Sequence, residues 1–319
     1  MKIVILDGHA TNPGDLSWVG LEELGDVTVY ERTPSDLIIQ RSKYASILLT
    51  NKTVLGEDEF SQLPNLRYVG ILATGYNTVD IMAAKDRGII VTNIPAYSTD
   101  SVAQMVFALI LELCFHVQEH SNAVYAGEWA ASKDFSFWKY PLIELAGKTL
   151  GIVGFGRIGR KTAEIAYAFG MNVIGYGIRP DLSYTHSNFK WATMDELLPE
   201  SDFVSLHCPL FPETKGIINK TQLAKMKKSA FLINTSRGPL VVEEDLCEAL
   251  NNDRIAGAAV DVLSVEPPKE GNPLLSAKNC IITPHIAWAT TEARGRLISI
   301  AVDNVRHFQE KNPINVVNI

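Results

Sequence analysis

The sequence feature that most restricts the fold is a glycine-rich segment at 154–159, which reads Gly-Phe-Gly-Arg-Ile-Gly. It directly follows a short apolar run at 150–153 and directly precedes a segment with helical spacing of small apolar residues. In such a strand, turn and helix, the glycines allow a tight turn and the close approach of a phosphate, and the start of the helix offers free amides. The alternative is a glycine-rich turn in an ordinary α/β protein. The setting favours a dinucleotide-binding turn.

The first hundred residues alternate short apolar runs with segments of helical periodicity. The runs are rich in Ile, Val and Leu and are bounded by turn residues, which is typical of strands in a parallel sheet. Strands are predicted at 2–7, 27–31, 46–50, 66–73 and 89–92, and helices at 15–24, 35–44, 58–63 and 78–87. The pattern indicates one compact α/β unit.

A second alternating series surrounds the glycine-rich segment. Its strands are predicted at 149–154, 172–176, 203–207, 230–235, 256–261 and 280–283, with helices after most of them. One long apolar helix, 101–125, precedes this series, and an aromatic-rich segment at 127–147 follows the helix. The last helix, 291–309, is expected to return to the first domain. We therefore expect a discontinuous substrate domain, 1–98 with 288–319, a nucleotide-binding domain, 99–287, and a cleft between them.

Charge and composition exclude several classes of partner. The 29 Lys and Arg residues against 36 Asp and Glu residues leave a net charge of −7, without a run of like charges, so no nucleic-acid partner is expected. The chain shows no secretion signal at its start and no uncharged apolar stretch long enough for a membrane span. The four cysteines, Cys114, Cys208, Cys247 and Cys280, form no CxxC pair. A cytoplasmic protein without a membrane partner is predicted.

A short metal-binding pattern occurs at the end of the long predicted helix. His116, Glu119 and His120 have the HxxEH spacing of an inverted zinc-protease signature, in which both histidines share one helix face. A five-residue pattern is easily met by accident, and no third ligand is recognisable in the sequence. We therefore expect no metal and a solvated helix end.

The strand after the glycine-rich segment bears on the choice between NAD and NADP. An Asp or Glu at its end would grip the ribose 2′-hydroxyl of NAD, but the chain has Gly177, Ile178 and Arg179 there. Without an acid at this position, and with an arginine close by, the loop can accept the 2′-phosphate of NADP. This arrangement favours NADP slightly over NAD. The alternatives are that Asp181 reaches the ribose or that Arg179 has no role. Both cofactors stay open.

Six segments carry a resemblance to a known family. They are 73–80 (ATGYNTVD), 145–159 (LAGKTLGIVGFGRIG), 207–214 (HCPLFPET), 234–238 (NTSRG), 261–267 (DVLSVEP) and 284–287 (PHIA). In this order and over almost the whole length, the chain resembles the D-2-hydroxyacid dehydrogenases, in particular their glycerate dehydrogenase or hydroxypyruvate reductase branch. The resemblance implies two α/β domains, a doubly wound Rossmann nucleotide-binding domain and a flavodoxin-like substrate domain.

The resemblance also assigns catalytic roles. Arg237 would hold the substrate carboxylate and carbonyl oxygen, a task suited to a planar guanidinium that keeps its charge. His285 would be the acid or base at the substrate oxygen, and Glu266 would hydrogen-bond to it and favour its protonated form. The alternatives from the residues alone are a surface ion pair for Arg237 and a structural histidine in a Pro-His pair.

Further residues are assigned to ligand binding by the same resemblance. In the first domain, Thr74 and Gly75 would bind the substrate carboxylate through backbone amides. Trp138 is a candidate for reaching the substrate pocket of a neighbouring subunit, and Asp261 would hold the nicotinamide ribose or carboxamide, or cap the following turn. The full set of expected cofactor-binding residues is Val102, Gly154, Gly156, Arg157, Ile158, Gly159, Gly177, Arg179, Pro209, Thr235 and Asp261.

The function implied is hydride transfer between NAD or NADP and a small D-2-hydroxy acid or 2-keto acid. D-glycerate with hydroxypyruvate, and also glyoxylate, agree best with the resemblance. The alternatives are a dehydrogenase of another D-2-hydroxy acid and a nicotinamide-sensing, corepressor-like binding protein on the same fold. The resemblance further implies a homodimer built through the nucleotide-binding domains, for which the aromatic segment 127–147 would supply contacts.

Overall fold

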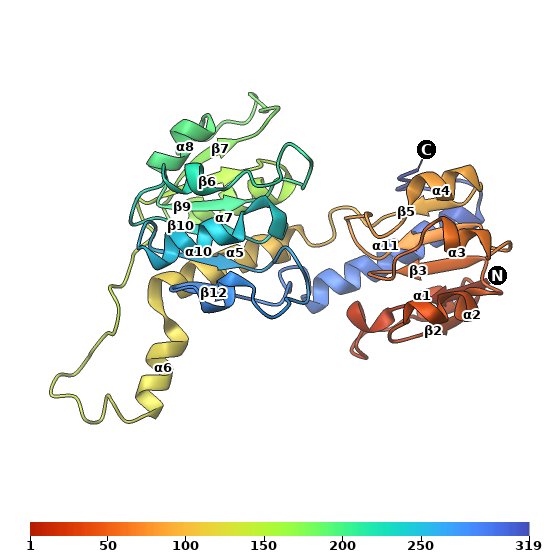
Figure 1. Cartoon of the computed structure of the whole chain (residues 1–319), viewed down its shortest axis with the longest axis horizontal. Coiled ribbons are helices and arrows are strands. Elements are labelled where there is room, and N and C mark those ends of the chain that lie inside the picture. The colour runs from red at the N-terminus through yellow and green to blue at the C-terminus, as the bar shows by residue number, and fades with distance from the viewer. Residues whose placement is uncertain (319) are drawn as a thin grey trace. The chain divides into compact units, whose positions relative to one another are not determined.

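The computed structural model describes residues 1–318 and divides the chain into two compact units. Met1–Ser98 and Trp288–Ile319 form the first unit, and Thr99–Ala287 forms the second. Each unit is a parallel β-sheet with helices packed against it (Figure 1).

The first unit contains a five-stranded sheet in the order β2-β1-β3-β4-β5. The strands are β1 (Lys2–Ile5), β2 (Asp26–Val29), β3 (Ile47–Thr50), β4 (Tyr68–Ile71) and β5 (Ile90–Thr92). All neighbours pair in parallel, with Ile3 opposite Val27 on one side and Ile47 on the other. The chain steps from β1 to β2 in one direction and then returns to β3 on the other side of β1. This flavodoxin-like order creates a topological switch point between β1 and β3.

The helices of the first unit are shorter than predicted, with one exception. They are η1 (Gly8–Ala10), α1 (Val19–Glu22), η2 (Ser35–Leu37), α2 (Ile38–Ser42), α3 (Glu57–Ser61), α4 (Ile81–Asp86) and α11 (Thr291–Gln309). The predicted helix 15–24 is reduced to α1 because the Asn12 side chain accepts hydrogen bonds from the Gly14 and Leu16 amides, which holds this part as a turn. Helix α11 has the predicted bounds, and its Leu297 and Val305 are buried in the core of this unit.

The second unit contains a seven-stranded sheet in the order β12-β11-β10-β9-β6-β7-β8. The strands are β6 (Thr149–Val153), β7 (Asn172–Tyr176), β8 (Phe189–Trp191), β9 (Phe203–Leu206), β10 (Phe231–Asn234), β11 (Gly257–Val260) and β12 (Cys280–Ile282). All neighbours are parallel, and the order reverses between β6 and β9, as in a Rossmann fold. Six strands lie where they were predicted. The edge strand β8 was missed because its three residues, Phe189–Trp191, are too few to establish a periodicity.

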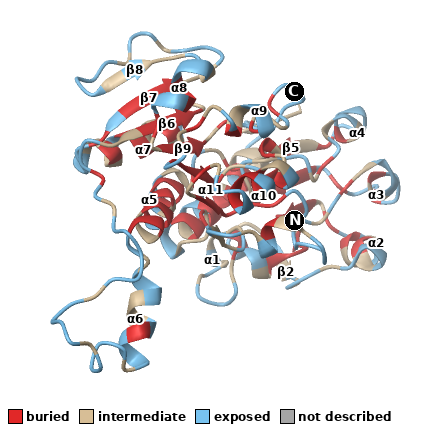
Figure 2. Cartoon of the chain, turned by 60° about the vertical axis from the view of Figure 1, so that its left-hand side comes forward, coloured by how far each residue is buried: buried red, intermediate tan, exposed pale blue. Residues whose placement is uncertain are grey.

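The predicted helix 101–125 is wrong as a single element. The chain forms α5 (Thr99–Phe115) and α6 (Val117–Tyr125), bent by 53° at His116, which has a left-handed φ of 46°. Helix α5 is largely buried, whereas α6 and the segment after it project from the unit and are largely exposed (Figures 1 and 2). The bend lets one part pack on the sheet and the other leave it. No single helix within residues 1–318 meets the length and apolarity of a membrane span, although α5 and α6 do so when taken together across the bend.

The remaining helices of the second unit cover its sheet. They are α7 (Arg157–Ala168), α8 (Met194–Glu200), α9 (Lys220–Leu223), η3 (Gly238–Leu240), α10 (Glu243–Asn251) and η4 (Pro273–Ser276). The strands β6, β9 and β10 carry almost only buried residues, which Figure 2 shows for β6 and β9 in red. This rigid sheet positions the loops at its carboxyl edge, where most of the predicted site residues lie.

Candidate active site

The glycine-rich loop follows β6 and begins α7, as predicted. Gly154 has a φ of 99°, and a Cβ on it would lie 2.4 Å from the Cys208 backbone nitrogen. A Cβ on Gly159 would lie 2.5 Å from the Gly154 carbonyl oxygen. At both positions only glycine fits between backbones. Gly156 is different, because a Cβ there would meet no atom within 4 Å.

The open side of Gly156 is suited to a pyrophosphate. Gly156 is the N-cap residue of α7, and no side chain caps the first turn of this helix. The first amides of a helix have no partner within the helix, and they carry the positive end of its dipole. Gly156 and Arg157 are exposed, so a phosphate can reach these amides. The loop therefore fits the diphosphate of a dinucleotide.

Thr235 supplies an unpartnered polar atom close to this edge. It follows β10, is 7% exposed, and its Oγ1 has no hydrogen-bond partner among residues 1–318. A buried hydroxyl without a partner is unfavourable unless a ligand or water bonds to it. Of the other expected cofactor residues, Val102 is buried on α5, and Pro209 is exposed after β9. Thr235 is the one whose chemistry fits a bound amide or ribose.

The loop after β7 contains an ion pair that the sequence did not indicate. The Asp181 carboxylate accepts hydrogen bonds from the Ser183 hydroxyl at 2.5 Å and from Nη2 of Arg160 at 2.8 Å. Hydrogen bonds from Ser183, and then from Arg160, lower the pKa of Asp181 to about 2. Arg179 is exposed and forms no ion pair with any residue of the described chain, and Gly177 is half-buried. Asp181 is thus already engaged, whereas the Arg179 guanidinium is available.

His285 and Glu266 form a hydrogen-bonded pair after β12 and β11. Nδ1 of His285 lies 2.6 Å from Oε2 of Glu266. A carboxylate oxygen can only accept, so Nδ1 donates and the proton-exchanging nitrogen is Nε2. Nε2 has no hydrogen-bond partner among residues 1–318, and the two side chains are 28% and 32% exposed. The pair is held in one orientation and still open to a ligand.

Asp261 positions the His285 loop. It is 1% exposed, and its carboxylate accepts hydrogen bonds from the Thr283 hydroxyl at 2.6 Å and from the amides of Ile286 at 2.9 Å and Ala287 at 2.8 Å. The Ser101 hydroxyl of α5 donates to the Ala287 carbonyl at 2.6 Å. Of the two roles considered for Asp261, these contacts favour the capping of the turn that carries His285.

Gly238 brings the Arg237 loop against the Glu266 loop. A Cβ on Gly238 would lie 2.0 Å from the carbonyl carbon of Leu263, a separation that no side chain permits. The Leu263 amide donates to Oε1 of Glu266 at 3.0 Å. The backbone contact at Gly238 thus helps to set where the carboxylate next to His285 lies.

Arg237 lies at the surface after β10. Its Nη1 donates to the Ser236 carbonyl at 2.7 Å, and it forms no ion pair within residues 1–318. Its backbone is fixed by Asn234, whose side-chain amide donates to the Arg237 carbonyl at 2.9 Å. The Ser236 hydroxyl donates to the Cys208 carbonyl at 2.7 Å. The surface ion pair considered as an alternative for Arg237 is therefore not formed, and its guanidinium is available for an anion.

His207 has a structural position beside this edge. Its Nε2 lies 2.9 Å from the Ser205 hydroxyl oxygen. Burial lowers the pKa of His207 to about 4, so the ring is neutral near pH 7. The structural interpretation of this histidine agrees with its contacts.

Thr74 and Gly75 lie after β4, in the first unit. The Thr74 hydroxyl donates to the Ile94 carbonyl at 2.7 Å, and the Asn93 side-chain amide donates to the Thr74 carbonyl at 2.8 Å. The amides of Thr74 and Gly75 donate no hydrogen bond to any of residues 1–318. Two consecutive unpaired amides in a fixed turn can bind an anion.

The histidines of the HxxEH pattern are used within the chain. Nε2 of His120 accepts the Lys139 amide at 3.0 Å, and Nδ1 lies 3.0 Å from the Phe115 and His116 carbonyls. No group of three His, Cys, Asp or Glu residues suited to a metal occurs within the described chain. Trp138 is 66% exposed on the segment after α6, where no other predicted site residue lies.

Three positioning residues were not recognised from the sequence: Gly238, Ser101 and Thr283. Gly238 was visible as the last residue of the 234–238 segment, but its role depends on a backbone 25 residues further along the chain. Ser101 donates to a carbonyl 186 residues away, so no local pattern could indicate its partner. These contacts became visible only with the loops in place.

Residues 107–287 match the model of the family described as D-isomer specific 2-hydroxyacid dehydrogenase, NAD binding domain. The chain belongs to this family. It is 53% identical, over 321 residues that cover 100% of both chains, to the hydroxypyruvate reductase of Blautia hydrogenotrophica. It is 42% identical, over 287 residues and 89% of each chain, to a glycerate dehydrogenase of Methylorubrum extorquens.

Solved structures give the same fold. An acyclic imino acid reductase in complex with NADPH and D-Arg matches with a TM-score of 0.84 at 31% identity, over 99% of this chain and 100% of that chain. The predicted family and the predicted fold class are both confirmed. The protein is an oxidoreductase of the D-2-hydroxyacid dehydrogenase family, which transfers a hydride between a nicotinamide cofactor and a D-2-hydroxy acid or its 2-keto acid.

Proposed function

We propose that this dehydrogenase reduces hydroxypyruvate to D-glycerate and glyoxylate to glycolate, and catalyses the reverse oxidations. The observation that carries the proposal is the His285–Glu266 pair, in which Nδ1 is held at 2.6 Å from the carboxylate and Nε2 stays available for a substrate oxygen. The full-length identity of 53% to a hydroxypyruvate reductase supports this choice of substrate.

In the reduction, one group of residues binds the substrate and another transfers the proton. The Arg237 guanidinium, which has no ion-pair partner among residues 1–318, holds the substrate carboxylate and the carbonyl oxygen. The amides of Thr74 and Gly75 bind the same carboxylate. A bound reduced nicotinamide supplies the hydride to C2 of the keto acid. Nε2 of protonated His285 gives a proton to the developing alkoxide, and Glu266 stabilises the imidazolium before the transfer.

The two directions of the reaction require different protonation states of His285. Reduction requires the imidazolium, whereas oxidation requires the neutral ring as the base that removes the hydroxyl proton. Each reduction consumes one proton overall. We therefore expect reduction to prefer lower pH than oxidation does.

For the cofactor, we propose NADPH as the preferred reductant, with NADH also accepted. The acid closest to the end of β7, Asp181, is engaged by Arg160 and Ser183, so it is not free to grip a ribose 2′-hydroxyl. The exposed Arg179 offers a cation to a 2′-phosphate. A structural relative at 31% identity was solved with NADPH. The ratio of kcat/KM with NADPH to that with NADH, in the wild type and in Arg179→Ala, tests this preference.

We propose a homodimer built through the nucleotide-binding units. The segment after α6 exposes large apolar side chains, with Phe135 91%, Tyr125 88% and Trp138 66% exposed. A surface of this kind is rarely left in water by a monomer. Figure 1 shows the segment extending away from the second unit with α6. Trp138 is the residue proposed to reach the partner's substrate site.

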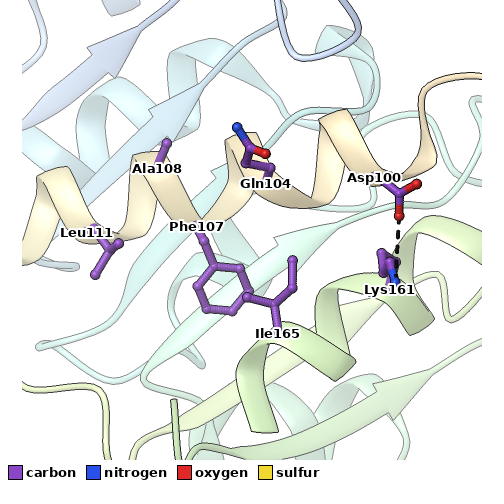
Figure 3. Close-up of a pocket in the computed structure, with 7 residues that line it drawn as sticks. All are labelled: Asp100, Gln104, Phe107, Ala108, Leu111, Lys161 and Ile165. Atoms are coloured by element: carbon purple, nitrogen blue, oxygen red, sulfur yellow. Dashed lines mark ion pairs between the residues drawn. The ribbon is translucent and has the colours of Figure 1, made fainter. Parts of the chain in front are cut away.

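A groove between α5 and α7 gives such a partner an apolar surface. It has a volume of about 410 Å³ and is lined by Phe107, Ala108, Leu111 and Ile165. At one end the Lys161 ammonium lies 3.6 Å from the Asp100 carboxylate (Figure 3). None of the predicted site residues lines it.

The dimer is tested by substitutions in the aromatic segment after α6. We expect the double variant Phe135→Ser with Trp138→Ser to sediment as a monomer, whereas Tyr44→Ser, which changes an exposed aromatic of the first unit, leaves the dimer intact.

The four cysteines fit a reducing compartment. Cys114, Cys208, Cys247 and Cys280 are all free thiols. We therefore propose the cytoplasm as the location. Protease protection in fractionated cells tests it.

The function is tested by following the absorbance of reduced nicotinamide with hydroxypyruvate, glyoxylate and pyruvate, each with NADH and with NADPH. Fast oxidation of the cofactor with hydroxypyruvate, lost in His285→Ala, is expected. If both cofactors bind but no keto acid is turned over, the proposed function is wrong and a nucleotide-sensing role takes its place. His186→Ala, which removes an exposed histidine of the same unit, is the control.

A further inference from the structure

The loop after β3 in the first unit is anchored by a buried carboxylate. Asp7, directly after β1, is 8% exposed. Its carboxylate accepts the amides of Asn51 at 2.7 Å, Lys52 at 2.6 Å and Thr53 at 2.7 Å. The hydroxyl of Thr53 donates to it as well, at 3.1 Å. Hydrogen bonds to a charged acceptor are the strong ones, so the backbone of this loop is rigid.

This anchor lies at the switch point of the first sheet. The strand order β2-β1-β3-β4-β5 reverses between β1 and β3, and Asp7 joins the carboxyl ends of these two strands. In open α/β sheets, ligands bind outside the carboxyl ends of the strands at such a point. The loop after β3 therefore occupies the part of this unit where a ligand is expected.

The same loop is tied to the proposed substrate loop after β4. The side-chain amide of Asn51 donates to the Leu72 carbonyl at 2.6 Å. The Leu55 amide donates to the Thr78 carbonyl at 3.0 Å, and the Asp80 amide donates to the Leu55 carbonyl at 2.9 Å. Adjacent strands lie about 4.8 Å apart, so the two loops run side by side along one edge.

Lys52 is the charged residue of this anchored loop. Its backbone amide is bound by Asp7, whereas its side chain is exposed. Within residues 1–318 its ammonium forms no ion pair and no hydrogen bond. A cation with a fixed backbone and no partner is therefore placed one strand away from the unpaired amides of Thr74 and Gly75. In a chain of net charge −7, such a cation also favours the approach of an anionic substrate.

We propose that Lys52 is a specificity-determining residue that hydrogen-bonds to an oxygen on C3 of the 2-keto acid. The inference rests on the proposed function, in which Thr74, Gly75 and Arg237 already take the carboxylate. The ammonium group is then left for the next acceptor along the substrate, which is the C3 hydroxyl of hydroxypyruvate. Pyruvate has a methyl group at this position and gains nothing from the cation. Lys52 thus selects substrates with an oxygen on C3 over those with a C3 methyl.

The test compares hydroxypyruvate with pyruvate in Lys52→Met. We expect kcat/KM for hydroxypyruvate to fall about 10- to 100-fold, mainly through KM, because Lys52 does not touch the reacting C2. For pyruvate, kcat/KM stays within about twofold. The melting temperature is unchanged, since the Lys52 side chain is exposed and without partners in the described chain. Lys52→Arg keeps a donor and part of the selectivity.

Lys85→Met is the matched control for charge. Lys85 is also exposed and lies in the last turn of α4, which leads to the opposite edge of the same sheet. Lys85→Met should leave kcat/KM unchanged for both hydroxypyruvate and pyruvate. An equal loss for both keto acids in Lys52→Met would show that Lys52 binds the carboxylate and would overturn the proposal, and no change in either would overturn it too. Absence of turnover in the wild type is a different result, because it contradicts the proposed function itself.

Discussion

Gly238 and Leu263 meet backbone to backbone, so closely that a Cβ on Gly238 would lie 2.0 Å from the Leu263 carbonyl carbon. The contact joins the loop of Arg237 to the loop of Glu266, since the Leu263 amide donates to the Glu266 carboxylate at 3.0 Å. Two residues with proposed catalytic roles are thus placed by a glycine that touches neither substrate nor cofactor.

Gly238→Ala is expected to destabilise the second unit and to reduce activity together. The added methyl group forces the two loops apart, at a cost of about 1 to 3 kcal/mol or more in the free energy of unfolding. Gly156→Ala is the control, because a Cβ there meets no atom within 4 Å. It should keep the wild-type denaturation midpoint but weaken nucleotide binding, since the methyl group occupies the open side of the phosphate-binding turn. Equal denaturation midpoints for Gly238→Ala and the wild type would contradict the argument.

Glu266→Gln is expected to lower kcat for reduction by about 10²- to 10⁴-fold, the usual contribution of an acid or base and its orientation. The amide can still accept from Nδ1 of His285, but it does not stabilise the imidazolium by charge. Steady-state kinetics of reduction in the wild type, in Glu266→Gln and in Glu266→Asp, which keeps the charge, measure this. A wild-type kcat in Glu266→Gln would show that the carboxylate charge is not needed.

Arg237→Lys is expected to lose most of kcat/KM for keto acids while cofactor affinity is unchanged. A lysine keeps the charge but lacks the planar pair of donors that fits a carboxylate and the neighbouring carbonyl oxygen. Added guanidinium ion should partly restore activity to Arg237→Ala. Steady-state kinetics and nucleotide titrations separate the two effects. Wild-type kcat/KM in Arg237→Lys would show that the charge alone is sufficient.

Asp261→Asn is expected to destabilise the His285 loop by about 1 to 3 kcal/mol. The Asp261 carboxylate accepts from a hydroxyl and two amides, and a side-chain NH₂ group would face one of these donors. Activity should fall through kcat, with nucleotide affinity close to wild type. Calorimetry, kinetics and a nucleotide titration are needed together. A large loss of nucleotide affinity at unchanged stability would instead favour a direct contact with the cofactor.

Stability should decrease with acidity through His207. The pKa of His207 is about 4 in the folded chain against 6.5 as the ordinary value, because burial disfavours its charged form. Between these values the unfolded chain binds more protons, so the stabilisation is complete above pH 6.5 and is lost as pH falls toward 4. The slope is at most about 1.4 kcal/mol per pH unit, and is smaller because part of the residue is exposed. His207→Gln should remove this slope from denaturation midpoints measured across the range, and an unchanged slope would mean that other groups cause the pH dependence.

Local patterns predicted much of this protein. The strand β7 and the helix α11 have the bounds predicted from the sequence, because an apolar run between turn residues and a long amphipathic helix are decided by neighbours in the chain. The glycine turn at 154–159 could also be recognised from adjacent residues alone, because the strand before it and the helix after it lie next to it in the sequence. In contrast, the break at His116 was not visible, since the helix must leave the sheet there and no proline or glycine marks the place.

The sequence by itself therefore determined the family, the fold class and the identity of the residues proposed to carry the reaction. Only the tertiary structure decided which other residues position these side chains. The positioning contacts are those of Gly238 with Leu263, of Asp261 with the amides after β12, and of Asp7 with the loop of Lys52. Each of these contacts joins residues between 25 and 46 positions apart. Parallel strands bring such loops to one edge of a sheet, and hydrogen bonds and backbone contacts across that edge leave no periodic signal in the chain.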